Sequence, residues 1–100
     1  MILEIATFDI KENLTEEFKV ACEKAKAVVS QSKGFKGLEF HQCMEISTKF
    51  VLMISWATLE DHTIAFRQSE LFKEWRAILS PYFNSAPVAE HYENYIRHNE

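Results

Sequence analysis

The sequence predicts an α+β fold whose elements follow one another in the order β-α-β-β-α-β. Short stretches of alternating apolar and polar residues, typical of half-buried strands, occur near both ends of the chain and twice in its middle. Two stretches with apolar residues three and four positions apart, typical of amphipathic helices, separate the first strand from the second and the third from the fourth. Such an order gives a four-stranded antiparallel sheet with helices on one face, which is a ferredoxin-like arrangement.

The first strand is predicted from Ile2 to Ile10. Ile2, Ala6, Phe8 and Ile10 share one face, and Leu3, Ile5 and Thr7 share the other. The first helix is predicted to begin at Asn13, because asparagine is a good N-cap and Glu16 stands three residues later, as in a capping box. Ser30 to Ser32 weaken this helix and Gly34 ends it.

The two middle strands differ in their apolar pattern. The second is predicted from Phe35 to Ile46, with a hairpin loop at residues 47–49, and its apolar residues Leu38, Phe40, Met44 and Ile46 share one face. The third, Phe50 to Trp56, has Phe50, Leu52, Ile54 and Trp56 on one face but Val51 and Met53 on the other. Apolar residues on both faces indicate that the third strand is buried on both sides.

The second helical region is predicted to be broken near Gln68. Thr58 caps a short helix from Leu59 to about Phe66, and Ser69 caps a longer one that ends at Ser80-Pro81, since the residue before proline avoids helical geometry. The fourth strand is predicted from Val88 to Arg97. Its two faces carry Val88, Tyr92 and Ile96, and Ala89, His91 and Tyr95.

The composition indicates one small domain, residues 1–100, that needs a partner. Hydrophobic residues make up 47% and aromatic residues 13% of the 100 residues. A single core of this size buries limited apolar surface, and two helices cannot cover both faces of the sheet. A second copy of the chain on the open face is the favoured solution, so we expect a homodimer. The alternative is a ligand or a different protein on that face.

Several classes of function are disfavoured. The formal net charge of -4 and the scattered lysines and arginines do not provide the basic stripe of a nucleic-acid binder. No apolar run reaches the ~20 residues of a membrane helix, and the N-terminus lacks the pattern of a signal peptide. We therefore expect a cytoplasmic protein without membrane contact. Cys22, Cys43 and the four histidines show no metal-ligand spacing, so neither a metal nor another cofactor is expected.

The segments Phe50 to Phe83 and Pro87 to Glu93 resemble the antibiotic-biosynthesis-monooxygenase family. The matching residues are Trp56, Glu60, His62, Ser69, Phe72, His91 and Tyr92, together with the Gly-Phe-x-Gly at residues 34–37. The resemblance implies a dimeric α/β barrel, in which two sheets pack face to face. Some members of the family resemble cofactor-free oxygenases of aromatic polyketides, and others degrade haem. The haem-degrading branch has an asparagine on the first strand and an iron-binding histidine on the later helix, where this chain offers Ala6 and Thr7, and Trp75 and Arg76. Haem degradation is therefore not expected.

His62 is the first choice for a catalytic residue. It stands in the first turn of a helix beside Asp61, and imidazole titrates near neutral pH, so it could take a proton from a phenol. A deprotonated, electron-rich aromatic can react with oxygen if the protein binds it and excludes water. The alternative is a structural histidine that hydrogen-bonds a carboxylate and fixes how the helix meets the sheet. The sequence leaves both open.

The residues expected to bind the substrate are Trp56, Phe66, Arg67, Phe83, His91 and Tyr92. The aromatic members could line a pocket between the sheet and its own helices, or belong to an ordinary core. Arg67, at the helix break, could hold an acidic group of a substrate or pair with a surface carboxylate. His91 could line the pocket, but a place at the dimer interface is favoured, because strand residues on an open face meet the partner.

The sequence thus predicts a monooxygenase that acts on an aromatic or quinone-like molecule without a cofactor. Two rivals remain: a non-catalytic small-molecule binding or stress-response protein, and a purely structural dimerisation domain. The fold cannot choose among the three, because function depends on the site.

Overall fold

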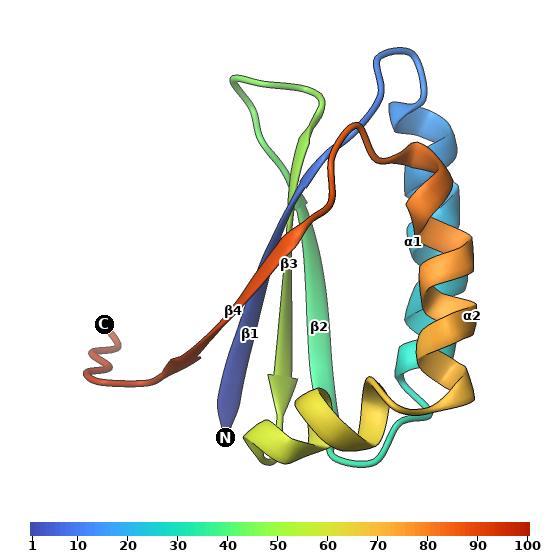
Figure 1. Ribbon diagram of the computed structural model, residues 1–100. Helices are drawn as coiled ribbons and strands as arrows, with labels where there is room; N and C mark the ends of the chain where they lie inside the picture. The colour runs from blue at the N-terminus through green and yellow to red at the C-terminus, as the bar shows by residue number, and fades with distance from the viewer.

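The computed structural model describes residues 1–100 and has the predicted order of elements. The strands are β1 (Ile2–Asp9), β2 (Phe35–Gln42), β3 (Lys49–Trp56) and β4 (Val88–Glu93), and the long helices are α1 (Thr15–Val29) and α2 (Glu70–Leu79). A short π-helix, η1 (Asp61–Phe66), follows β3, and a 3-10 turn, η2 (Ser80–Tyr82), follows α2. The antiparallel sheet has the strand order β2-β3-β1-β4, with α1 and α2 on one face (Figure 1). This confirms the ferredoxin-like fold.

The hydrophobic core lies between the sheet and the two helices. The central strands β1 and β3 contribute the inward residues of the predicted alternation, Ala6, Phe8, Phe50, Leu52, Ile54 and Trp56, all of them buried. Phe18 of α1 meets Phe50 edge to face, with 4.9 Å between ring centroids. Because β1 and β3 are the inner strands of the sheet, their inward side chains lie at the centre of this core.

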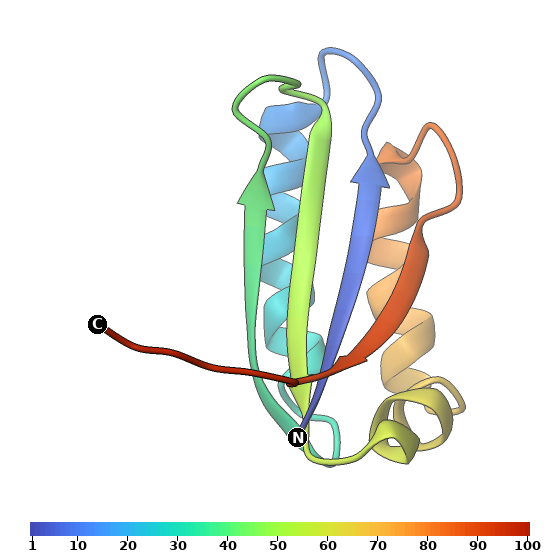
Figure 2. The ribbon, with the colours of Figure 1, turned by 90° about the vertical axis from the view of Figure 1, so that its left-hand side faces the viewer.

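The other face of the sheet carries no helix. In the register of β1 with β3, Leu3 lies opposite Ser55, Ile5 opposite Met53 and Thr7 opposite Val51. Leu3, Ile5, Val51 and Met53 form an apolar strip along the middle of this open face. Figure 2 views the sheet from this side. The tail after Glu93 leaves the sheet on this side and crosses in front of β1 and β3, with the Tyr95 side chain 92% and the Ile96 side chain 73% exposed (Figure 2).

Two helix caps agree with the prediction and one does not. The Thr58 hydroxyl accepts a hydrogen bond from the Asp61 amide, and the Ser69 hydroxyl accepts one from the Phe72 amide. The expected cap at Asn13 is wrong, because α1 begins two residues later and its N-cap, Leu14, makes no side-chain bond. Asn13 has a positive φ of 69° in the turn that precedes the helix. Asparagine tolerates this left-handed conformation better than most residues do.

Two strands are shorter than predicted. β2 ends at Gln42 rather than Ile46, so Met44 is 97% exposed in the loop that leads to β3. β4 ends at Glu93 rather than Arg97. In each case the neighbouring strand provides the limit: Gln42 pairs with Phe50 near the start of β3, and Glu93 pairs with Ile2 at the start of β1.

Of the two glycines, Gly34 is expected to tolerate a side chain less well than Gly37. It has φ +79°, and a Cβ there would overlap the carboxyl group of the buried Asp61. We expect Gly34→Ala to lower the free energy of unfolding by roughly 2–4 kcal/mol, since left-handed backbone costs an alanine about 1–2 kcal/mol before any overlap is counted. Urea unfolding measures this loss. Gly37→Ala is the control for the overlap, because Gly37 also has a positive φ (+141°) but a Cβ there meets nothing within 4 Å; equal losses in the two variants would contradict the role of Asp61.

Candidate functional site

A cavity of about 340 Å³ lies between the helix side of the sheet and the segments η1 and α2. Its wall is mostly apolar, and its polar members are Glu4, His62 and Arg67. The remaining residues around it are Ala6, Phe8, Leu52, Ile54, Phe66, Phe72, Trp75, Pro87 and Ala89. A mainly apolar cavity with a few convergent polar groups is the usual form of a small-molecule site.

Glu4 is the polar residue of this cavity that the sequence analysis did not select. It lies on β1 on the same face as Ala6 and Phe8, and only 5% of its surface is exposed. Its Oε1 atom accepts a hydrogen bond of 2.9 Å from Nε1 of Trp56. Burial raises the pKa of Glu4, while the Trp56 hydrogen bond and the charge of Arg67 act in the opposite direction. The signal in the sequence was an acidic residue at an inward position of an otherwise apolar strand face.

His62 is buried and lines the same cavity. Its Nε2 atom lies 3.4 Å from Oε1 of Glu4, and its ring stacks on Trp56 with 5.2 Å between centroids. Burial, together with the nearby charges of Arg67 and His91, lowers the pKa of His62 to about 4. His62 is therefore neutral at pH 7, when it carries one N–H donor and one lone-pair acceptor.

His91 lies on the helix side of the sheet, so its favoured assignment to the open face is wrong. It pairs with Glu4 in the register of β4 with β1, and its Nε2 atom lies 2.7 Å from Nδ1 of His62. Ala89 and His91 share one face of β4, as predicted, but this face points to the helices. His91 thus completes a connected polar cluster of Trp56, Glu4, His62 and His91, which we call the Glu4–His62 cluster.

The other predicted binding residues separate into two groups. Phe66 and Arg67 line the cavity, and Arg67 makes no ion pair. Trp56 does not line it, because its ring is fully buried behind His62, where it holds Glu4. Phe83 stacks on Phe8 and lines an adjoining hollow of about 310 Å³. Tyr92 lies on the open face opposite Leu3, away from the cavity.

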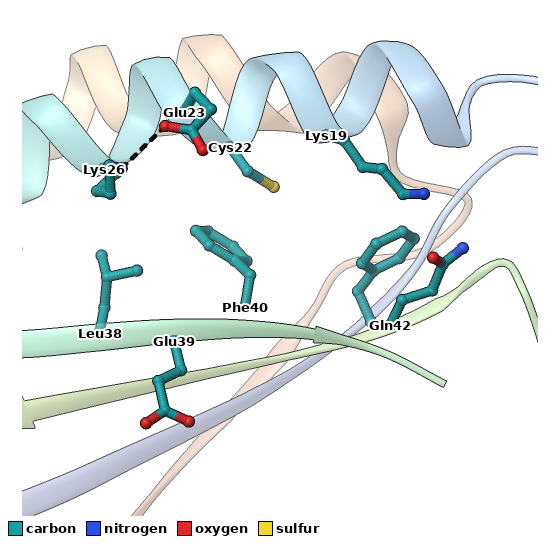
Figure 3. A pocket seen from close by; sticks show the side chains of 9 residues that line it. Lys19, Cys22, Glu23, Lys26, Leu38, Glu39, Phe40 and Gln42 are labelled. Atoms are coloured by element: carbon teal, nitrogen blue, oxygen red, sulfur yellow. Dashed lines mark ion pairs between the residues drawn. The ribbon is translucent and has the colours of Figure 1, made fainter. Parts of the chain in front are cut away.

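A second hollow, of about 390 Å³, separates α1 from the edge strand β2 (Figure 3). Cys22 points into it from the helix and Phe40 from the strand, whereas Glu39 points away to the open face (Figure 3). Burial raises the pKa of the Cys22 thiol to about 12, so this thiol stays protonated. None of the predicted site residues lies here.

The structure brings no three histidine, cysteine or acidic side chains together as metal ligands, and no helix is long and apolar enough to cross a membrane.

The free energy of unfolding is expected to fall as the pH is lowered from 6.5 towards 4. Between these values the unfolded chain binds a proton at His62, whose ordinary pKa is 6.5, while the folded chain does not, with a pKa of about 4. The stabilisation is present above pH 6.5 and its loss amounts to roughly 3 kcal/mol. His91, with a lowered pKa, acts in the same direction, and Glu4, with a raised pKa, opposes it. Urea unfolding near pH 7 and pH 5 measures the first part of this loss, about 2 kcal/mol, which should shrink in His62→Gln; an equal loss in both proteins would contradict it.

Comparison with known proteins gives likenesses over nearly the whole chain. The family model of antibiotic biosynthesis monooxygenases matches residues 1–78. YczJ of Bacillus subtilis (strain 168), an uncharacterized protein, is 38% identical over 94 residues, which are 94% of this chain and 99% of YczJ. A solved structure from Bordetella bronchiseptica, assigned to the antibiotic biosynthesis monooxygenases, is 26% identical with a TM-score of 0.91. The match covers 95% of this chain and 97% of the Bordetella chain. SnoaB of Streptomyces nogalater, a cofactor-independent oxygenase, matches with a TM-score of 0.83 over 99% of this chain and 97% of SnoaB. At 13% identity this likeness shows a shared fold.

Proposed function

The chain belongs to the antibiotic biosynthesis monooxygenase family, and from this we propose that it is a cofactor-independent monooxygenase of an aromatic or quinone-like small molecule. The substrate is bound in the cavity between the sheet and its own helices, with the Glu4–His62 cluster at the reacting end. The observation that carries the proposal is this apolar cavity with a buried carboxyl group and a buried imidazole at one place in its wall. Proton transfer to such groups turns a phenol into an anion that reacts with oxygen.

Arg67 favours a substrate with an ionisable oxygen. It lines the cavity beside His62 and has no carboxylate partner in the fold. Its charge lowers the pKa of Glu4, His62 and His91, so the guanidinium field reaches the whole cluster. The same field stabilises a phenolate or another anionic oxygen in the cavity. Phe66, Phe72 and Trp75 provide the aromatic wall for the ring.

The protein is further proposed to act as a homodimer that pairs its open sheet faces. Members of this family are commonly dimers. Leu3, Ile5, Val51 and Met53 form an apolar strip that no helix of the same chain covers. The exposed Tyr95 and Ile96 of the tail line a hollow together with Leu3 and Ile5 of this face. A second copy would bury both sets of side chains at once, which supports this face as the interface.

The proposal predicts oxygen consumption with a hydroquinone or anthrone, without an added metal, flavin or haem. Ala89→Met should reduce kcat/KM by roughly tenfold or more, equivalent to about 1.4 kcal/mol of transition-state stabilisation, because Ala89 lines the cavity and a longer side chain fills it. Ala77→Met, on the exposed side of α2, is the matched control. An oxygen electrode and product analysis measure both.

Two outcomes would contradict the proposal. Saturable binding of the probes without oxygen consumption would identify a binding protein rather than an oxygenase. Equal kcat/KM values for Ala89→Met and the wild type would place the reaction outside this cavity. Melting curves of all three proteins show whether a loss of turnover comes from a loss of fold.

A further inference from the structure

Glu4 is an acidic residue where the core would otherwise be apolar. It is 5% exposed and is followed on the same strand face by Ala6 and Phe8. A buried carboxyl group costs free energy unless hydrogen bonds or charges compensate it. Strand β1 is central, so the position of Glu4 is fixed by β3 on one side and β4 on the other. A residue that is costly for folding and firmly held is a strong choice for a chemical role.

The two carboxyl oxygens of Glu4 have different surroundings. Oε1 accepts the Trp56 N–H at 2.9 Å and lies 3.4 Å from Nε2 of His62. Oε2 has no hydrogen bond, yet no fully buried side-chain oxygen of the protein lacks a partner, so Oε2 is open to the space beside it. Glu4 lines the cavity, so the cavity is the space to which we assign Oε2. One oxygen thus anchors the group and the other is free to meet a substrate.

The position of the proton on His62 follows from its neighbours. Nε2 lies beside the Glu4 carboxylate and Nδ1 lies 2.7 Å from Nε2 of His91. A carboxylate oxygen accepts but cannot donate, so the neutral ring is best matched with its proton on Nε2. Nδ1 then accepts the N–H of His91. In this arrangement His62 presents an N–H, and not a lone pair, to the Glu4 side of the cavity.

We propose that Glu4 accepts the substrate proton and that the Nε2–H of His62 donates a hydrogen bond to the phenolate oxygen that remains, an assignment that rests on the proposed function. The O–H bond of the hydroquinone breaks, the proton bonds to Oε2 of Glu4, and the electron pair stays on the phenolate oxygen. The N–H of His62 and the charge of Arg67 stabilise that anion. His91 does not touch the substrate; it is a positioning residue that holds the His62 ring in the required tautomer.

The acid–base properties of the pair support the same division. Burial raises the pKa of Glu4 and lowers that of His62 to about 4. The carboxylate is therefore a stronger base than one at the surface, and the imidazole a weaker one than usual. Environments that move two neighbouring pKa values in opposite directions separate the acceptor from the donor.

Anaerobic binding of a 1,4-naphthohydroquinone tests the assignment, because without oxygen the reaction stops after proton transfer. The wild type should show the absorption of the hydroquinone anion together with the infrared band of a protonated carboxyl group. Glu4→Gln should form the anion roughly 10²-fold more slowly or not at all, although its amide oxygen can still accept the Trp56 N–H. Glu4→Asp, which keeps an acceptor, should retain part of the signal, and Glu12→Gln, at an exposed loop position, should match the wild type. With oxygen present, the acid limb of the kcat pH profile should disappear in Glu4→Gln.

The outcomes distinguish this assignment from the proposed function. Anion formation and oxygen uptake that persist in Glu4→Gln would overturn the role of Glu4 and leave the oxygenase standing. Loss of the anion in His62→Gln together with its retention in Glu4→Gln would make His62 the acceptor. If Glu4→Gln fails to fold, an anion without a protonated-carboxyl band in the wild type overturns the assignment. A wild type that forms no anion and consumes no oxygen would overturn both proposals together.

Discussion

The proposed homodimer is expected to dissociate in Met53→Asp at concentrations where the wild type stays paired. Met53 lies on the open face of β3, opposite Ile5 of β1 and Glu39 of β2. Two-fold symmetry places the new carboxylate in the interface twice, and each copy stands beside the acidic Glu39. Burying an unpaired charge costs several kcal/mol, so the dissociation constant should rise by roughly a hundredfold or more. Sedimentation velocity over a range of concentrations measures the change.

Val20→Asp is the matched control for this prediction. Val20 is 60% exposed on α1, far from the open face of the sheet, so the same substitution there should leave the dimer intact. Circular dichroism shows whether the separated Met53→Asp chain keeps its fold. A wild-type mass of 11.7 kDa at every concentration, or an unchanged dimer in Met53→Asp, would rule out the open face as the interface.

The sequence predicted the fold where the pattern within an element is sufficient. The doubly apolar β3 shows this, since its alternation separates Leu52 and Ile54, which lie in the core, from Val51 and Met53, which lie on the open face. The ends of β2 and β4 could not be obtained in this way. Met44 continues the alternation of β2, but a strand exists only where a neighbour accepts its hydrogen bonds, and that depends on the pairing with β3.

The site was harder to predict because it is made by contacts between distant residues. His62 was selected from its place after Thr58, but its contact with His91, 29 residues later, depends on the register that sets His91 opposite Glu4. A period of two assigns residues to alternate faces without saying which face is covered, so Tyr92 was expected in the pocket with His91 and lies on the opposite face. Glu4 was recognisable from its inward position on β1, whereas its hydrogen bond to Trp56 required the pairing of β1 with β3.

His62→Ala is expected to lose both turnover and stability. The ring is 3% exposed, stacks on Trp56 and bonds His91, so its removal leaves a hole and an unpaired partner at a cost of roughly 2–3 kcal/mol. In a chain of this length 1 kcal/mol corresponds to about 4–8 °C in melting temperature. Loss of the N–H donor to the anionic oxygen should lower kcat with a hydroquinone by roughly 10²–10³-fold. The oxygen electrode and thermal unfolding measure the two effects.

Two further variants separate the chemical role of His62 from its structural role. His62→Phe keeps a ring against Trp56 and has no N–H, whereas His62→Gln keeps an N–H donor and loses the stacked ring. If His62 donates a hydrogen bond to the substrate oxygen, His62→Phe should lower turnover more than His62→Gln does. If the ring serves only as packing, His62→Gln should lower turnover more than His62→Phe, because glutamine then disturbs the core more than phenylalanine. His98→Ala, in the exposed tail, should match the wild type in both measurements, and a His62→Ala protein that did the same would remove His62 from both roles.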